Sequence, residues 1–374
     1  MKTTILCIAL LLCLEPGRAQ VVTTAVPFLG FVPSPEANGM GGISSCRTTC
    51  DPFAMTLNPA QLGLQSLSQN FGAGLFAPKT QWIPSFGISD LTYRADVISA
   101  GLRIDDYLGV PFPLSVGLGY SFVEFDLGTF YRTIFDPTAV GTYHPVDRST
   151  GYTLGVGFDY GIRFGIGVTM KKIRSASLVF GTLMNDTMGT ANGTAYDYGA
   201  LATIPFGSLI PGAKTLIPDV EPNLDLSIGL GRSNVGNAIS YIDPAQADPL
   251  PRSAYVGLAL EASVVTHHFG NDWKLVSVCI ARQANNLLVT QDYYPGSGYL
   301  GGFGHIDVIK NVFGGRGTHD VDARKGFQAD LLELFTYRRG SFDEPGYGFI
   351  HTSGFSIRLG GMLKLLEAIG VLQA

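Results

Sequence analysis

The sequence predicts an all-β protein, a transmembrane antiparallel β-barrel, on three observations. Only 15% of its 374 residues are charged, against roughly 25% in soluble domains, and its 48 glycines are nearly twice the usual share. The apolar residues are dispersed, and no run of about 18 of them could form a transmembrane helix. Instead, apolar and small or polar residues alternate over segments of about ten residues, the length of a tilted bilayer-spanning strand.

The composition also excludes other classes of protein. An apolar fraction of 46% with a net charge of only −5 is not that of a disordered chain. A sequence pI near 5.7 argues against a basic nucleic-acid binder. We therefore expect membrane lipid, and no nucleic acid, among the partners.

The first residues predict export. Lys2 precedes an apolar run over residues 5–14, which a Glu-Pro-Gly sequence ends. Small residues stand three and one positions before Gln20. This is the layout of a secretory signal peptide, too short to cross a bilayer. We expect residues 1–19 to be removed after Ala19 and the mature chain to reach the bacterial outer membrane.

The alternation is clearest near residue 155, where Leu154, Val156 and Phe158 alternate with Gly155 and Gly157. Such a segment has one apolar face and one small or polar face. The pattern fits a soluble β-sandwich or a barrel whose apolar face meets lipid. Gly and Ser on the second face, in place of Lys and Glu, favour the barrel, and so do the aromatic residues near segment ends, although a soluble exported β-protein stays an alternative. These aromatic residues are Tyr120, Phe122, Tyr152, Tyr160, Phe327, Tyr337 and Phe355.

The pattern divides the chain into regions. Residues 20–68 show no alternation and are rich in Pro, Gly and Asn, which predicts an N-terminal plug, or hatch. Residues 69–363 form the predicted barrel. Residues 364–374 form a tail that lacks a terminal aromatic residue, so the tail is either a short amphipathic helix or a poorly matched last strand.

The connections between strands are of two kinds. Residues 135–148, 202–222 and 296–325 predict long loops rich in Pro, Gly or Asp, whereas residues 159–164 predict a tight reversal. Long loops at one end and short turns at the other are typical of membrane barrels.

Three cysteines remain once the signal peptide is removed. Cys46 and Cys50 flank three residues in an exported segment, so a local disulfide, a free pair or half of a zinc site are all open. No second Cys or His pair stands nearby, which argues against zinc. Cys279 is predicted to be a small packing residue in a strand.

Five charged residues are predicted to face the barrel lumen, because they lie on the small or polar face of their segments. We expect them to pair with one another or with carbonyl groups of the plug, and so to hold the plug in place. They are Asp159, Arg163, Lys171, Asp225 and Arg358. We expect no catalytic site, cofactor site or metal site, and hence no enzyme.

Short motifs in a preserved order resemble a known family. The stretch with Gly39, Met40, Gly41 and Gly42, followed by Asp51-Pro52 and by Asn58, Pro59 and Ala60, resembles the opening of FadL-like outer-membrane proteins, especially the PorV/PorQ branch. Similar pieces follow at residues 167–175, 230–241, 249–257, 327–342 and 352–357. Cys46 and Cys50 interrupt the small residues of the family pattern, and residues 62–105 match only loosely.

The resemblance implies a barrel of about 14 strands with an N-terminal hatch. For the PorV branch it implies a non-enzymatic role in type IX protein secretion, in which the barrel binds cargo signal domains and passes them from the translocon to the surface attachment machinery. For the wider FadL class it implies a channel for hydrophobic small molecules. The residues alone choose neither function.

Overall fold

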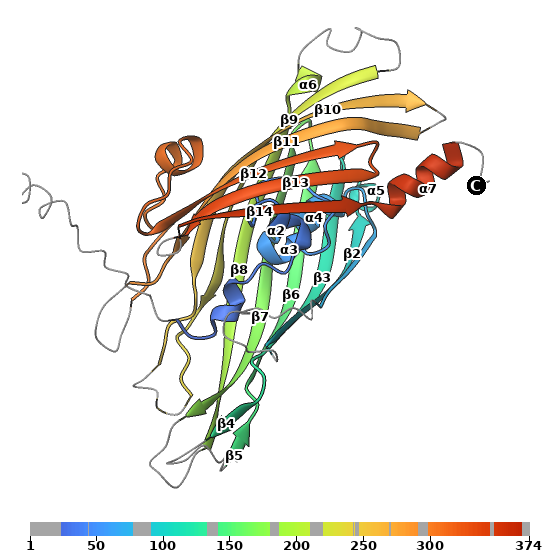
Figure 1. Ribbon diagram of the computed structural model, residues 1–374. Coiled ribbons are helices and arrows are strands. Elements are labelled where there is room, and N and C mark those ends of the chain that lie inside the picture. Colours follow the sequence, from blue (N-terminus) through green and yellow to red (C-terminus); the bar gives the residue numbers. More distant parts are fainter. Residues whose placement is uncertain are drawn as a thin grey trace, which may run out of the picture.

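The computed structural model describes residues 24–43, 45–77, 91–132, 141–179, 187–209, 220–241, 243, 247–268, 271–290, 298–344 and 348–368 (Figure 1). The predicted signal peptide lies outside the described residues.

One sheet of 12 antiparallel strands dominates the fold, and its strands follow chain order. A separate two-stranded sheet pairs β4 (Phe130–Arg132) with β5 (Gly141–Tyr143). The described residues therefore give 12 strands in the main sheet, where the resemblance implied about 14 in a barrel. The twelve are β1 (Phe71–Phe76), β2 (Thr92–Arg103), β3 (Leu114–Asp126), β6 (Val146–Asp159), β7 (Arg163–Val179), β8 (Thr187–Pro205), β9 (Val220–Gly236), β10 (Ser253–His268), β11 (Asn271–Leu287), β12 (Val321–Leu331), β13 (Phe335–Glu344) and β14 (Gly348–Ile357).

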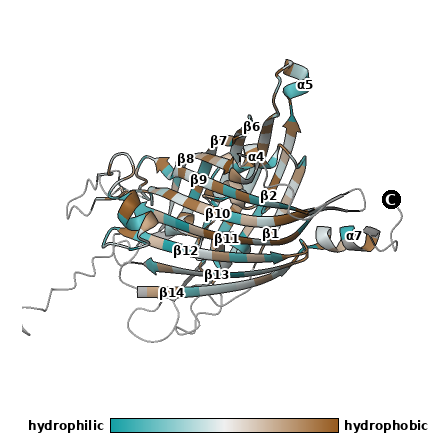
Figure 2. Cartoon of the chain, turned by 90° about the horizontal axis from the view of Figure 1, so that it is seen from above, coloured by the Kyte–Doolittle hydropathy of each residue, from teal (hydrophilic) through white to brown (hydrophobic). Residues whose placement is uncertain are grey.

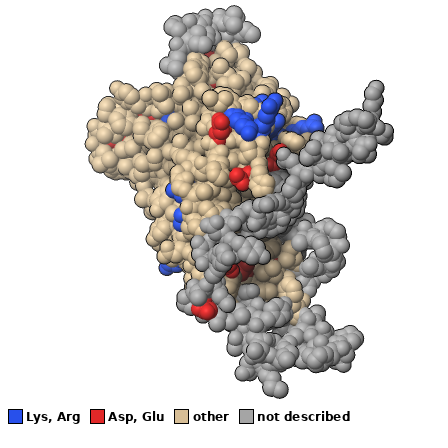
Figure 3. Space-filling model, turned by 90° about the vertical axis from the view of Figure 1, so that its left-hand side faces the viewer, with Lys and Arg blue, Asp and Glu red and all other residues tan. Residues whose placement is uncertain are grey.

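The two faces of the sheet differ as the alternation predicts. On β3 and β6, Leu118 lies opposite Leu154, and both side chains are exposed, at 63% and 44%. Between such residues, Thr153 and Gly155 are buried on the other face. Figure 2 shows brown and teal alternating along the strands, and Figure 3 shows few charged side chains on the visible surface of the described residues. The outward face is therefore largely apolar.

The sheet curves around residues 24–70, here called the inner segment (Figure 1). It holds a 3₁₀ helix, η1 (Pro27–Gly30), and three short helices, α2 (Pro35–Gly39), α3 (Ala54–Leu57) and α4 (Ala60–Gln65). Ser34 caps α2 by accepting a hydrogen bond from the Ala37 amide at 2.9 Å. The inner segment contacts strands from β2 to β14, which places it on the concave face.

Aromatic packing joins the start of the inner segment to the sheet. Phe28 is buried, and the Phe31 ring meets the rings of Tyr93 on β2 and Phe125 on β3 edge to face, with centroids 5.8 and 5.3 Å apart. Such pairs stabilise by about 0.5–1.5 kcal/mol beyond the area that they bury. This cluster fixes the position of η1 against the sheet.

Alternate connections lie at the same end of an antiparallel sheet. The turns at residues 160–162 and 332–334 share one end with α5 (Asp105–Leu108), α6 (Phe206–Leu209) and α7 (Leu359–Ala368); this is called the short-turn end. The described part of the connection between β11 and β12, residues 288–290 and 298–320 with the π-helix η5 (Val308–Phe313), lies at the opposite, long-loop end. No helix among the described residues is long and apolar enough to span a membrane.

Several predicted boundaries differ from the structure. The predicted loop 202–222 holds the end of β8, α6 and the start of β9, and the predicted loop 135–148 holds β5 and the start of β6. The strands outlast the clean alternation because backbone pairing with a neighbouring strand continues beyond it. At the C-terminus, β14 ends at Ile357 and α7 starts at Leu359, ahead of the predicted boundary at residue 363.

Candidate functional site

The Gly-Met-Gly-Gly stretch lies against β12, β13 and β14. Gly41 and Gly42 have φ angles of 73° and 78°, a conformation that favours glycine. The Gly41 amide donates a hydrogen bond to Thr352 Oγ1 at 3.0 Å, and Met40 is fully buried. A Cβ atom on Gly340 would overlap the Gly41 backbone. The motif therefore brings two backbones into direct contact.

The Asn-Pro-Ala stretch makes a second contact, with β7 and β8. The buried Asn58 amide donates to the Ser45 carbonyl at 2.7 Å and to the Ala200 carbonyl at 3.2 Å. Its Oδ1 accepts from the Ala60 amide at 3.1 Å, at the start of α4. The Ala60 backbone lies where a Cβ atom on Gly165 would stand. The Pro59 backbone lies where a Cβ atom on Gly167 would stand. Asn58 thus links two turns of the inner segment to the 12-stranded sheet, which is called the wall below.

Glu36 is the centre of a buried ion cluster. Its carboxylate accepts hydrogen bonds from Arg47 of the inner segment, from Thr49 Oγ1 at 2.7 Å and from Arg338 Nη2 of β13 at 2.8 Å. Burial disfavours the charged carboxylate, but Arg47 and Arg338 outweigh it and hold the pKa of Glu36 below its usual value. The charges thus tie the inner segment to β13.

All three guanidinium nitrogens of Arg338 donate hydrogen bonds. Its Nε donates to Gln328 Oε1 and its Nη1 to Ser356 Oγ, each at 2.8 Å, so that Arg338 spans β12, β13 and β14. Only 5% of its side chain is exposed. Arg338 is not among the residues predicted from the sequence, since the adjacent Arg338 and Arg339 put a charge on both faces of the strand. The signal lay in the period of two, since an outward Tyr337 turns Arg338 inward.

Asp51 lies next to this ion cluster. Ser34 donates its hydroxyl to Asp51, and the Asp51 carboxylate accepts from the Phe53 amide at 3.0 Å. Burial and the charge of Glu36 raise the pKa of Asp51. Hydrogen bonds from Gln65 to the Thr49 and Asp51 carbonyls, at 2.8 and 2.9 Å, close this part of the inner segment on itself.

Four of the five predicted lumen charges find partners on the sheet. Arg163 Nη2 lies 2.7 Å from Asp225 Oδ2, Lys171 Nζ lies 2.7 Å from Asp197, and Arg358 Nη2 lies 3.4 Å from Asp330. Asp159 accepts a hydrogen bond from the Gly161 amide within its own turn. The ion-pair partners just named belong to the sheet, whereas Arg338 of β13 pairs with Glu36 of the inner segment.

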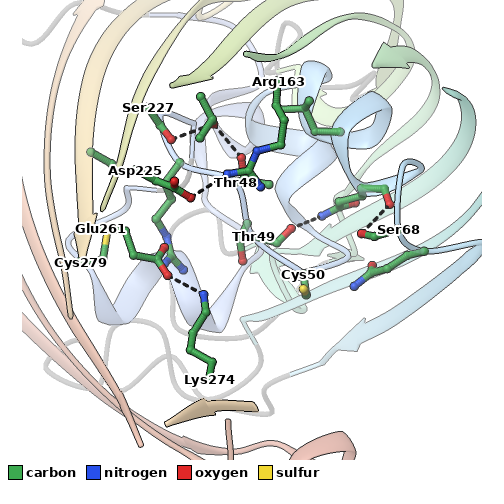
Figure 4. A pocket seen from close by; sticks show the side chains of 16 residues that line it. Thr48, Thr49, Cys50, Ser68, Arg163, Asp225, Ser227, Glu261, Lys274 and Cys279 are labelled. Atoms are coloured by element: carbon green, nitrogen blue, oxygen red, sulfur yellow. Dashed lines mark hydrogen bonds and ion pairs between the residues drawn. The ribbon is translucent and has the colours of Figure 1, made fainter. Parts of the chain in front are cut away.

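A cavity of about 230 Å³ lies between the inner segment and strands β7 to β11 (Figure 4). Two ion pairs line it, Arg163 with Asp225 and Lys274 with Glu261, the latter at 2.8 Å. Asp225 and Glu261 are direct cross-strand partners. A lining of both charge signs, with hydroxyl groups on Thr48, Thr49, Ser68, Thr203 and Ser227, suits contact with small polar molecules.

Of the arrangements that the sequence left open for Cys46 and Cys50, the structure has both as free thiols. Cys46 is a buried free thiol whose Sγ lies 4.0 Å from the Arg282 carbonyl, against Gly257 of β10. Cys50 is an exposed free thiol that lines the cavity. Cys279 is buried in the same apolar cluster as Cys46, a packing position.

Among the described residues, no group of three or more His, Cys, Asp or Glu side chains could hold a metal ion.

Comparisons with known proteins give little. No model of a known protein family matches the chain, and no curated protein matches it. Among solved structures, the toluene transporter TbuX of Ralstonia pickettii is similar, with 14% identity, 87% of this chain and 90% of that chain covered, and a TM-score of 0.32. A similarity of this size supports no argument about this chain.

Proposed function

We propose that this chain is a non-enzymatic outer-membrane β-barrel of the channel type, with the inner segment as its plug. The observation that carries the proposal is the difference between the two faces of the sheet. Apolar side chains such as Leu118 and Leu154 are exposed outward, which is unfavourable in water and favourable in a bilayer. Each strand of the sheet pairs with the next through backbone hydrogen bonds, which is the pairing on which membrane barrels are built.

The plug assignment is supported by how tightly the inner segment is held. Its backbone lies directly on glycines of the wall, and its Glu36 carboxylate is bound by Arg338. Buried charges that are paired in this way are costly to separate. We therefore expect the inner segment to stay in place in the resting protein and to restrict the passage of solutes.

For the finer function, we propose the secretion role that the PorV/PorQ resemblance implies. The supporting feature is η5 at the long-loop end, where Ile309 and Phe313 expose 77% and 61% of their surface. Exposed apolar side chains outside the lipid-facing wall are typical of protein-binding surfaces. A channel for hydrophobic molecules would instead need an apolar path beside the plug, and the cavity there is lined by ion pairs.

The test is a pull-down of the tagged protein from outer membranes in mild detergent, with mass spectrometry of what co-purifies. The proposal expects translocon subunits, or exported proteins that share one C-terminal domain. An Ile309→Asp, Phe313→Asp variant should lose them while keeping its membrane insertion. Recovery of the barrel alone, with stoichiometric fatty acid or another lipid bound, would overturn the secretion role in favour of the transporter.

A further inference from the structure

The helix α7 has two faces that differ sharply. Leu359, Met362, Leu363 and Leu366 follow the spacing i, i+3, i+4, i+7, so they share one face of the helix. Leu359 and Leu363 are 68% and 54% exposed, and Met362 is exposed as well. This apolar face points away from the protein.

The opposite face is fixed to the sheet by two contacts. Gly361 is buried against the backbone of the β12–β13 turn, where a Cβ atom would overlap the Glu333 carbonyl group. One helical turn along, Lys364 Nζ lies 2.8 Å from Glu333 Oε2. The helix is therefore held at one turn of the wall with its apolar face outward.

The turn that holds α7 is itself fixed by hydrogen bonds to the neighbouring strand β11. Leu332 and Glu333 have φ angles of 55° and 54°, a conformation that costs non-glycine residues roughly 1–2 kcal/mol each. The Leu332 amide donates to the Leu275 carbonyl at 2.7 Å, and the Lys274 amide donates to Glu333 Oε1 at 3.1 Å. Glu333 thus binds both the wall and α7, which sets the direction of the helix.

The apolar face of α7 continues the outward face of the last two strands. Phe335, Tyr337, Phe355 and Ile357 are exposed there, and the rings of Phe335 and Phe355 stack with centroids 6.1 Å apart. Leu359 follows directly at the start of the helix. Figures 1 and 2 show α7 extending outward beyond the strand ends rather than across the end of the sheet. Residues 369–374, which follow α7 in the sequence, contain no charged side chain.

We propose that α7 is an interfacial membrane helix. It lies in the boundary between headgroups and acyl chains of the leaflet at the short-turn end, with Leu359, Met362 and Leu363 in the acyl region. Helices with one apolar face bind membranes in this orientation. The inference rests on the proposed barrel function, because the lipid occupant is deduced from continuity with the lipid-facing strands. Its role is to anchor β14, the last strand in the chain, to the bilayer.

The experiment measures tryptophan fluorescence in phosphatidylcholine vesicles with brominated acyl chains. Leu363→Trp and Met362→Trp report on α7, Phe355→Trp on the wall and Lys310→Trp on the exposed surface of η5. Each signal is taken as the excess over the parent protein, which has two tryptophans. Heat-modifiable gel mobility shows that each variant is folded.

We expect the emission of both α7 variants to be quenched and blue-shifted, and more strongly by bromines near the headgroup than by deep ones. Phe355→Trp should be quenched and Lys310→Trp should not. Quenching at residue 355 without quenching at residues 362 and 363 would overturn the membrane helix and leave the barrel intact. The same conclusion would follow if the emission at residues 362 and 363 shifted only when a second copy or another protein binds. Loss of quenching at residue 355 as well would overturn the barrel itself.

Discussion

Arg338 is the residue on which the attachment of the inner segment depends most. It contacts Glu36, Gln328 and Ser356 at once, and its side chain is 95% buried. Breaking a buried ion pair leaves an uncompensated charge, and this penalty exceeds what the intact pair contributes. The inner segment is therefore held by a contact that is expensive to lose.

We predict that Arg338→Ala lowers the free energy of unfolding by about 3–5 kcal/mol, because Glu36 keeps its charge but loses one of its two arginines. Unfolding in urea from detergent micelles measures this change. Small-solute leakage in liposome swelling should rise at the same time, since the plug loses its contact with β13.

Two matched controls separate this contact from arginine loss in general. Arg94→Ala removes an exposed pair with Asp96 and should change stability little. Arg163→Ala removes a wall pair with Asp225 and should leave leakage unchanged, although the sequence pattern alone assigned Arg163 to holding the plug. Equal leakage in the Arg163 and Arg338 variants would contradict the assignment.

The Glu36 carboxylate should make the attachment sensitive to acid. Burial opposes its charge, but Arg47 and Arg338 hold its pKa in the folded protein below the usual value of 4.5. Its contribution to stability is then complete above about pH 4.5 and is lost as the pH falls through the folded pKa. Asp51, whose pKa is raised, contributes with the opposite sign.

We predict that Glu36→Gln reduces the loss of stability at acid pH. Unfolding measured between pH 3 and 7 tests this, and an unchanged dependence of stability on pH would contradict the prediction.

At the scale of elements, the fit of α4 against β6 decides how close the inner segment lies to the wall. Gly63 on α4 faces the backbone of Val156 and Gly157, with no side chain between them. Glycine faces on both elements let the backbones touch, and any added methyl group needs room that the close packing does not leave. The small-residue face of the sheet is thus a packing surface for the inner segment.

We predict that Gly63→Val lowers stability by about 1–3 kcal/mol or more, the cost of overpacking a filled interface. The same change at Gly30, where nothing lies within 4 Å of an added Cβ atom, should have a much smaller effect. Limited proteolysis of the inner segment, together with denaturant unfolding, measures both. If Gly30→Val were as damaging as Gly63→Val, backbone entropy rather than contact would be the cause.

The strands could be predicted from the sequence, and the inner contacts could not. Alternation at Leu154–Gly155–Val156 places each side chain on a face, since the period of a strand is two. It says nothing about which wall residue lies opposite Glu36, because that pair is 302 residues apart in the chain. The position of Cys46 against Gly257 is a long-range contact of the same kind.

At the scale of the whole molecule, one sheet separates two environments. Leu118, Leu154 and Ile166 are exposed outward, whereas Thr153 and Thr169 are buried inward and hydrogen-bond to each other at 2.8 Å. A soluble protein would place the apolar face inside. The exposed apolar face is the reason to propose a bilayer around this sheet, which curves around the inner segment.

The measurement that tests this account most directly is a nitroxide accessibility scan of the protein in lipid vesicles. Labels are placed by Leu154→Cys, Val156→Cys and Ile166→Cys outward, and by Thr153→Cys and Thr169→Cys inward, in a Cys50→Ser background. The account predicts that the outward labels collide with oxygen and not with a water-soluble nickel complex. The inward labels should collide with neither oxygen nor the nickel complex. Free access of the nickel complex to the outward labels would contradict a membrane barrel and restore a soluble β-protein.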